Sequence, residues 1–367
     1  TLVGMPDDAV IRTITVLVIA CPHALGLAIP LVVSIATERA AKGGVLIKDR
    51  LALEGMRTVD AVLFDKTGTL TKGEPTVTAI EVTDGRTADQ VLAWAAAAEA
   101  DSEHPLARAI VDAARQRHLT VPDASDFQSS PAVGVSADVD GTRIQVGGPA
   151  VLEQEHAAEL AVADRWRGDG AIILHVLADG AVIGALALAD EIRPESPAAI
   201  DALHARGIEV VMITGDADAV AKSVASQLGA DRYFAGVKPE DKSQKVADLQ
   251  REGRTVAMVG DGVNDAPALA AADIGIAMGG GTDVALETAD AAVLHGRVRD
   301  IPDMIALSKA VMGNIHQNIT IALGLKAVFL VTTLLGITGL WPAILADTGA
   351  TVLVTANAMR LLGWRAR

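Results

Sequence analysis

The residues with the clearest capacity for chemistry are Asp65 and the six that follow it, Lys66 to Thr71. They come after the apolar run 61–64, which is typical of a buried strand. Open α/β sheets bind ligands at the carboxyl ends of strands, where Asp65 would lie. Small and hydroxylic residues after it can turn backbone amides toward a phosphoryl group, beside the positive charge of Lys66. Asp65 can therefore attack a γ-phosphate and form an aspartyl phosphate; the alternative is a simple capped turn.

A second acidic cluster follows another apolar run, 255–259. Two glycines let the backbone turn sharply there and present Asp261 and Asp265 at a strand end. Magnesium prefers one or two carboxylates together with phosphate oxygens and water. Asp65 and Asp261 would suit such an ion, with Asn264 and Asp265 as supporting residues.

A third apolar run, 209–213, ends in Thr214, Gly215 and Asp216, whose hydroxyl and amides suit phosphoryl oxygens. Lys242 could neutralise charge on the transferring group. Helical patterns separate these runs, which favours βαβ crossovers and a parallel sheet. They lie at 195–206, 217–228 and 240–251.

The segment from Asp65 to Thr71 resembles the phosphorylation signature of P-type ATPases, and the later clusters occur in that family's order. The resemblance implies a doubly wound phosphorylation domain of the haloacid-dehalogenase type that uses ATP and Mg²⁺. We expect Asp65, Thr67 and Asp261 to hold the Mg²⁺. Hydrolase relatives often carry a second aspartate two residues after the nucleophile, as acid or base. Thr67 cannot serve in that way, which favours a pump over a phosphatase.

An insertion of about residues 79–189 separates the nucleophile from the third run. Its first part is alanine-rich and helical, and its later part has strand-like runs near 134–147 and 171–188. Ser102 to Ala107 resembles the Ser-Glu-His-Pro signature of heavy-metal P-type ATPases, which implies adenine binding by Glu103 and His104. The family usually has two glycines later in this insertion, and only one of the two is present here. Within this nucleotide-binding region the expected contacts are Gly134 and Gly147, while Ala132 replaces a glycine and puts affinity in doubt.

The two ends of the chain are strongly apolar, and its mean hydropathy is +0.35. Residues 13–36 carry no charged side chain, and about 20 residues suffice to cross about 30 Å of hydrocarbon. Further spans are expected at 317–337 and 340–359, joined by a turn too short for anything but a membrane hairpin. Arginines follow the last span, so the positive-inside rule places the C-terminus and the catalytic region in the cytosol. These arginines are Arg360, Arg365 and Arg367.

The only cysteine lies in the first of these spans. Pro22 and Pro30 are expected to interrupt the helix and free backbone carbonyls. Cys21 and His23 flank the first interruption, and thiolate with imidazole suits copper or zinc. Ionisable residues inside a membrane usually mark an ion pathway, although a buried structural cysteine is the alternative.

This segment also resembles the Cys-Pro-X metal-transport helix in its Cys-Pro-His form, which is associated with copper exporters. The last two spans instead resemble zinc/cadmium/lead exporters, in which an intramembrane lysine and aspartate pair near the metal. The resemblance thus implies a transported-metal site of Cys21, His23, Lys326 and Asp347, or a mere packing salt bridge between the last two. The hard carboxylate of Asp347 favours a divalent ion over Cu(I).

We therefore predict an α/β cytosolic region, with a haloacid-dehalogenase-like domain and an inserted α+β nucleotide-binding domain, plus three transmembrane helices. The expected function is ATP-driven export of a Zn/Cd/Pb-type ion across the plasma membrane. A copper exporter, a membrane-tethered phosphatase and a truncated, non-transporting fragment that binds ATP are the alternatives. The expected parts are 1–40 (Cys-Pro-His helix), 41–78 and 190–312 (phosphorylation domain), 79–189 (nucleotide-binding domain) and 313–367 (transmembrane hairpin).

Two further expectations concern partners. The net charge of −15 argues against nucleic acid. The family's actuator domain, with its Thr-Gly-Glu loop, and several spans precede the Cys-Pro-X helix. No Thr-Gly-Glu occurs here, so we expect the chain to be the C-terminal half of a pump that needs the N-terminal half.

Overall fold

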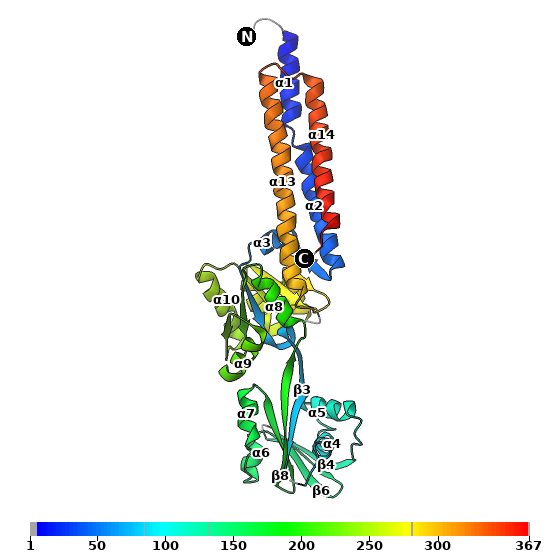
Figure 1. Ribbon diagram of the computed structural model, residues 1–367, viewed down its shortest axis with the longest axis vertical. Helices are drawn as coiled ribbons and strands as arrows, with labels where there is room; N and C mark the ends of the chain where they lie inside the picture. Colours follow the sequence, from blue (N-terminus) through cyan, green and yellow to red (C-terminus); the bar gives the residue numbers. More distant parts are fainter. Residues whose placement is uncertain (1–5, 84, 132, 280–281, 366–367) are drawn as a thin grey trace.

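The computed structural model describes residues 6–83, 85–131, 133–279 and 282–365. Three units follow one another along its long axis: a helical bundle, a seven-stranded sheet with its helices, and a six-stranded sheet (Figure 1). Ala132 and Arg367, which entered the predictions on nucleotide affinity and orientation, lie outside the described residues.

The seven-stranded sheet has the order β1-β13-β12-β11-β2-β9-β10. All neighbours are parallel except β1, which is antiparallel to β13. The central strand β2 lies between β11 and β9, so the three predicted runs end side by side, and the doubly wound α/β prediction is confirmed. The strands are β1 (Val45–Ile47), β2 (Ala61–Asp65), β9 (Glu209–Ile213), β10 (Arg232–Phe234), β11 (Val256–Gly260), β12 (Ile274–Met278) and β13 (Ala291–Val293).

Helices cover both faces of this sheet, and they include the three expected from the helical patterns, now α8 to α10. The side chains of β2, β9 and β11 are nearly all buried, as both faces of a parallel sheet require. The helices are α3 (Arg50–Met56), α8 (Ser196–His204), α9 (Asp218–Leu228), α10 (Lys242–Arg251), α11 (Ala266–Ala271) and α12 (Asp283–Thr288), with 3₁₀ turns at Pro239–Asp241 and Val263–Asp265.

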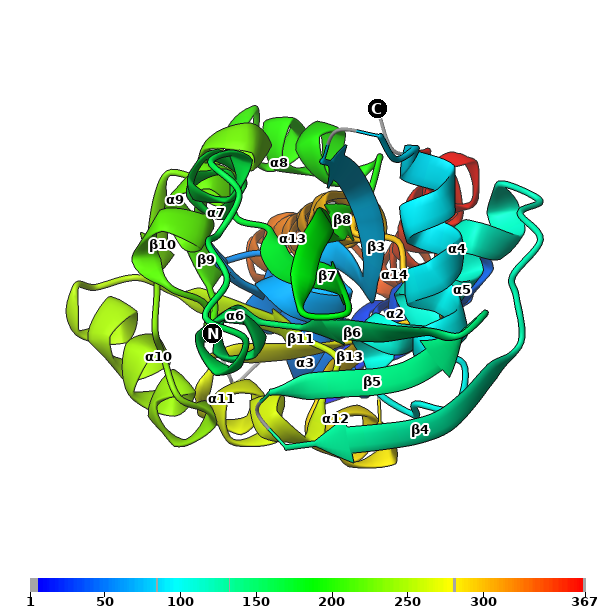
Figure 2. The same cartoon turned by 90° about the horizontal axis from the view of Figure 1, so that it is seen from below.

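The six-stranded sheet is antiparallel, in the order β3-β8-β7-β6-β5-β4. Its helices α4 and α5 pack on one face, and α6 and α7 pack on the other (Figure 2). Long strands β3 and β8 lead into and out of this unit. The elements are β3 (Thr71–Val82), α4 (Ala88–Ala98), α5 (Pro105–Gln116), β4 (Ala124–Ser130), β5 (Gly134–Val139), β6 (Thr142–Gly147), α6 (Pro149–Gln154), α7 (Val162–Gly168), β7 (Ile172–Ala178) and β8 (Ala181–Ile192).

The helical bundle consists of α1 (Pro6–Ala20), α2 (His23–Lys42), α13 (Asp300–Leu334) and α14 (Leu340–Met359), followed by a 3₁₀ turn over Arg360–Gly363. The helix is interrupted at Cys21 and Pro22, between α1 and α2, as expected. The prediction that Pro30 also interrupts the helix is wrong, because Pro30 lies inside the continuous helix α2.

Within the described residues, two helical segments are long and apolar enough to cross a membrane, Thr13–Lys42 and Asp300–Leu334. The third predicted span corresponds to α14, which packs against both segments but is not one of these two. Large apolar side chains on all of these helices are exposed, as lipid-facing side chains would be. They include Leu17, Leu27, Val328, Val331, Leu345, Val352 and Leu353.

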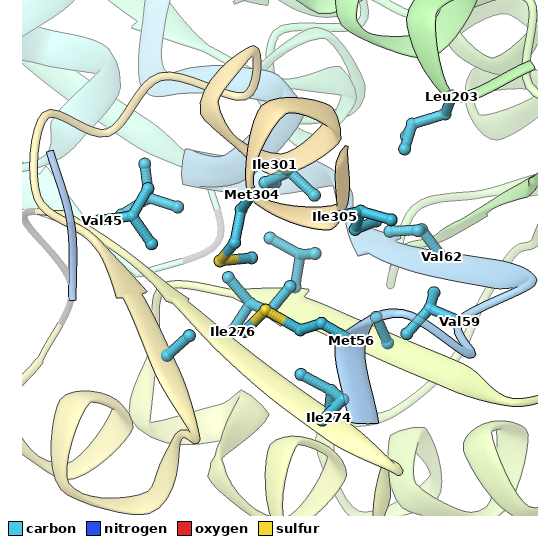
Figure 3. Packing of buried hydrophobic residues seen from close by; sticks show 14 of the residues in the cluster. Val45, Met56, Val59, Val62, Leu203, Ile274, Ile276, Ile301, Met304 and Ile305 are labelled. Carbon is cyan, nitrogen blue, oxygen red and sulfur yellow. The ribbon is translucent and has the colours of Figure 1, made fainter. Parts of the chain in front are cut away.

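The 35-residue helix α13 connects the bundle to the seven-stranded sheet. Its first turns insert Ile301, Met304 and Ile305 into the core beneath the sheet, against Met56 and Ile276 (Figure 3). Higher up, buried asparagines tie α13 to α14: Asn357 donates to Asn318, which in turn donates to Asn314. The bundle is therefore joined to the sheet by a continuous, well-packed helix.

Candidate functional site

Three carboxylates converge at the carboxyl ends of β2 and β11. Asp65, Asp261 and Asp265 each offer an oxygen, and these oxygens lie within 4.8 Å of one another. Lys242, the first residue of α10, donates from Nζ to Oδ1 of Asp65 and to Oδ1 of Asp265, at 2.6 Å each. Asp65, Asp265 and Lys242 are all buried. One lysine thus faces three acidic groups.

The electrostatics of this cluster follow from burial and crowding. Burial, reinforced by the charge of Asp265, raises the pKa of Asp65 to about 7 despite the opposing charge of Lys242. Burial and Asp265 also raise the pKa of Asp261. Burial alone would lower the pKa of Lys242, but the charges of Asp65 and Asp265 outweigh it and the pKa is raised. When all three carboxylates are ionised, the single positive charge of Lys242 does not balance their negative charge.

This donor set fits a divalent, oxygen-seeking cation. Three close carboxylates and one ammonium carry a net charge of −2, which Mg²⁺ would neutralise. Asp265 has a further task, because its Oδ2 accepts from the backbone amides of Asp261 and Gly262 at 3.2 and 3.3 Å. It therefore holds the turn that presents Asp261.

The turn after Asp65, Lys66–Leu70, passes directly beneath Asp261. Gly68 has φ +74°, and a Cβ there would come within 1.8 Å of Oδ2 of Asp261, so only glycine fits. Lys66 is buried and forms an ion pair of 2.6 Å with Asp216. Lys66 therefore ties the β2 loop to the β9 loop.

The remaining residues predicted for this site line its opening. Thr214 is buried, and its hydroxyl accepts from the amide of Asp216 at 3.1 Å. Thr67, Gly215 and Asn264 are exposed beside the carboxylates. They are accessible to a substrate.

The sequence analysis missed the residues that clamp this turn from β8 and the segment after it. Arg193 donates to the carbonyls of Gly68 and Thr71 at 2.9 Å each. Asp190 accepts from the hydroxyl of Thr71 and, at 2.9 Å, from the amide of Gly73. These partners lie about 120 residues away in sequence, and the charged run 190–193 at the end of an apolar strand was the only available signal.

A second cluster lies in the bundle, at the break between α1 and α2. Nζ of Lys326 lies 3.0 Å from Oδ1 of Asp347 and also donates to the backbone carbonyls of Ile19, at 2.7 Å, and Cys21. The ammonium thus satisfies carbonyls that the broken helix leaves free.

The two metal-binding side chains of the break are adjacent to this pair. Sγ of Cys21 lies 3.6 Å from Nε2 of His23, and Nδ1 of His23 lies 3.8 Å from Oδ2 of Asp347. The structure therefore brings all four residues predicted for the transported metal together. Their side chains supply thiol, imidazole and carboxylate donors.

The nucleotide-binding candidates belong to the six-stranded unit, which follows the seven-stranded unit along the long axis (Figure 1). His104 is exposed and caps α5: its Nδ1 accepts from the amide of Leu106 at 3.2 Å, and this cap does not use Nε2. Glu103 beside it is exposed. Capping fixes the ring without using its second nitrogen.

Gly134 and Gly147 are directly opposite each other on β5 and β6. A Cβ on Gly134 would lie 2.2 Å from the carbonyl oxygen of Val146, and one on Gly147 would lie 2.2 Å from that of Val133. Close approach of the two strands therefore requires both glycines, whether or not a ligand is bound.

The sequence analysis did not select Glu99, although this residue lies close to Glu103 and His104 in the sequence. It is buried at the end of α4, and burial raises its pKa to about 7 against a hydrogen bond from Ser102. The carbonyl of Glu99 also accepts from the amide of Ser102 at 3.0 Å. A lone charge after the buried alanine run 95–98 was the signal that could have found it.

These features define the class of the protein. A family profile described as haloacid dehalogenase-like hydrolase matches residues 59–273, in agreement with the sheet order and with the position of Asp65 at the end of the central strand. Within that class, the chain belongs to the heavy-metal transporting P-type ATPases.

The similarity to individual relatives is high. The chain is 46% identical over 358 residues to the zinc/cadmium/lead-transporting P-type ATPase of Escherichia coli K12, covering 97% of this chain and 48% of that protein. It is 47% identical over 319 residues to the copper-exporting P-type ATPase B of Archaeoglobus fulgidus, covering 87% and 46%. The chain thus spans about half the length of the curated relatives it matches.

Solved structures give the same assignment. A zinc-transporting PIB-type ATPase in its E2.Pi state superposes with a TM-score of 0.90 at 47% identity, covering 96% of this chain and 57% of that one. The catalytic CPx-ATPase domain CopB-B has a TM-score of 0.53 at 30% identity, covering 75% and 98%. The family expected from the motifs is confirmed.

Proposed function

We propose that this chain supplies the catalytic domains and part of the ion pathway of an ATP-driven heavy-metal exporter that works through an aspartyl phosphate. The observation that carries the proposal is the position of Asp65, buried at the end of the central strand, 2.6 Å from Lys242 and within reach of Asp261. The catalytic domains and the C-terminus would face the cytosol, and the pump would lie in the plasma membrane.

In the proposed reaction, an oxygen of Asp65 attacks the γ-phosphorus of ATP and the bond to the β–γ bridging oxygen breaks, releasing ADP. No described side chain donates a hydrogen bond to Oδ2 of Asp65, which leaves that oxygen available as the nucleophile. Lys242 would hold the attacking carboxylate in place and offset the charge that develops on the phosphoryl group. Thr214, Gly215 and Asp216 would contact phosphoryl oxygens.

Mg²⁺, when bound, would neutralise phosphate and carboxylate charge, and Asp65, Thr67 and Asp261 would hold it. Asp265 would orient Asp261 through the turn amides, and Asn264 would support them from the rim. Asp65 must be ionised to attack; burial raises its pKa to about 7 in the absence of a cation, and a bound Mg²⁺ would favour the ionised form.

For the nucleotide, we propose that His104 and Glu103 bind the adenine, with Gly134 and Gly147 shaping the nearby strands. Buried Glu99 is an additional candidate, because it hydrogen-bonds the same segment. Transfer to Asp65 then requires the six-stranded unit to approach the seven-stranded one, and β3 and β8 are the described connections between them.

For the cargo, we propose a Zn/Cd/Pb-type divalent ion bound by Cys21, His23 and Asp347. A thiolate, an imidazole and a carboxylate together suit a borderline divalent ion better than Cu(I). Lys326 would compensate Asp347 while the site is empty and give way as the ion enters. Copper is the second candidate, because the thiol and imidazole of the Cys-Pro-His break lie only 3.6 Å apart.

Radiolabelling tests the central claim. Incubation with γ-labelled ATP and Mg²⁺ should give an acid-stable, hydroxylamine-labile label, and Asp65→Asn should abolish it because an amide is not a nucleophile at neutral pH. Asp248→Asn, at a half-buried position of α10 where Asp248 pairs with Lys245 and Arg251, is the matched control and should retain the label. A label that persists in Asp65→Asn would refute the assignment.

A further inference from the structure

A separate cavity of about 370 Å³ lies where the lower ends of α2 and α13 meet the segment after α14. It is distant in the fold from the Asp65 cluster and from the cysteine break. One wall is apolar, with Val45, Met304, Leu307 and the half-buried ring of Trp364. Its rim is basic and consists of Arg39, Lys42, Arg297 and Arg365.

The charges on this rim do not cancel. Arg297 pairs with Asp300 at 3.0 Å, and Lys42 pairs with Glu38 at 2.5 Å. Asp303, the other acidic lining residue, lies near the positive charges of Arg206, Arg299 and Arg297. Among the described residues, neither Arg39 nor Arg365 has a carboxylate oxygen within 4.0 Å, and the acidic group that influences Arg39, Glu38, already pairs with Lys42. Two guanidinium groups are therefore left at the edge of an apolar hollow.

The length of α14 indicates the depth of the cavity relative to the membrane. α14 has 20 residues, about 30 Å, which matches the hydrocarbon thickness of a bilayer. Trp364 and Arg365 follow its end by five and six residues, mostly in a 3₁₀ turn that advances about 2 Å per residue. They therefore lie about 10 Å beyond the hydrocarbon, level with lipid headgroups, where tryptophan is enriched.

From these features we infer that the cavity binds the phosphate headgroup of an anionic phospholipid of the inner leaflet. Arg39 and Arg365 contact the phosphate, for which guanidinium is the preferred side chain. The apolar wall and Trp364 cover the glycerol and the upper acyl chain. The inference uses the orientation proposed above, with the C-terminus cytosolic, but not the identity of the metal or the phosphorylation chemistry.

Such a lipid would contact α2, α13 and the end of α14 together, at the point where the bundle meets the sheet. Anionic lipid content of the membrane would then adjust how firmly these helices are held. The cavity is therefore a binding site for a regulatory or structural lipid and not for a substrate.

Native mass spectrometry of the purified chain in detergent, titrated separately with phosphatidylglycerol and phosphatidylcholine, tests the inference. We expect tighter retention of phosphatidylglycerol, and a dissociation constant raised about tenfold or more in Arg39→Gln/Arg365→Gln, since each basic residue contributes substantially at a membrane surface. The matched control is Lys309→Gln/Arg50→Gln, which removes two exposed charges outside the cavity and should change little.

Three outcomes would overturn the inference. Equal retention of the two lipids would show no headgroup recognition. Equal loss in both double variants would show general surface attraction instead of a site. Displacement of phosphatidylglycerol by inorganic phosphate would show that the site takes free phosphate and not a lipid. If the double variant unfolds, the exposed single change Arg365→Gln gives the same comparison.

Discussion

Nζ of Lys242 lies 2.6 Å from Oδ1 of Asp65, although 177 residues separate the two in sequence. The same ammonium contacts Asp265, so it holds Asp65, the proposed nucleophile, and the turn that presents Asp261 in one arrangement. Lys242 is therefore the residue that links Asp65 to Asp265 across the proposed phosphorylation site.

Lys242→Met should therefore reduce the rate of phosphorylation from ATP by about 10²–10³-fold, the usual cost of losing one positioned electrostatic group. Loss of the positive charge should also raise the pKa of Asp65 further and move the pH dependence of labelling upward. Rapid-quench labelling across pH measures both effects. Lys245→Met on the same helix is the control, and an equal defect there would mean that helix α10 itself had been disturbed.

The stability of the unit built on the seven-stranded sheet should depend on pH through Asp65. Its pKa rises from 3.8 to about 7 on folding, so the folded state binds this proton more tightly than the unfolded state. By linkage, stability is lost as the pH rises from about 4 to about 7.

Asp65→Asn removes that titration. Its melting temperature should exceed that of the wild type, and the gain should be larger at about pH 8 than at about pH 5. Differential scanning calorimetry at the two pH values measures the difference. A gain independent of pH would show that Asp65 does not titrate in this range.

The proposed transported-metal site can be examined by spectroscopy. Co²⁺ added to the detergent-solubilised chain should give thiolate-to-metal charge-transfer absorption that Cys21→Ser abolishes. Asp347→Ala should weaken Co²⁺ binding and competition by Zn²⁺, because the hard ligand is lost. Thr351→Ala, one turn along α14, is the control. Retained divalent binding in Asp347→Ala, with preference for Cu(I), would favour the copper alternative.

The nucleotide site is tested with His104→Gln. Loss of one ring nitrogen and of stacking should cost about 1–3 kcal/mol, which raises the dissociation constant for ATP by roughly tenfold or more. Calorimetric titration of the whole chain with a non-hydrolysable ATP analogue measures it. His118→Gln, an exposed histidine just beyond α5, should bind normally. Unchanged affinity in His104→Gln would place the nucleotide elsewhere.

Much of the catalytic arrangement was predictable from sequence because it depends on strand ends. Three apolar runs closed by Asp65, Thr214 and Asp261 specify neighbouring parallel strands, and these ends necessarily meet at one edge. The convergence of Cys21 and Asp347 came from the family resemblance. Its geometry depends on the helix break, which proline chemistry indicates.

Other features left no local signal. Strand β4 reads Ala124 to Ser130, with exposed and mainly polar side chains, so no alternation marks it. Pro30 was expected to break α2, but the helix continues through it, because an apolar segment gains more by keeping its remaining backbone hydrogen bonds. The clamp of Arg193 on Gly68 depends on a tertiary crossing that no periodicity encodes.

Helix α13 has its lower end fixed among the side chains beneath the sheet and carries Lys326 far above it. From Ile301 to Lys326 the rise is about 38 Å at about 1.5 Å per residue. A tilt of about 5° about the fixed end would displace the ammonium by about 3 Å, roughly the length of its bond to Asp347. A rotation of a few degrees at the lower end of α13 is therefore enough to form or break the ion pair between Lys326 and Asp347.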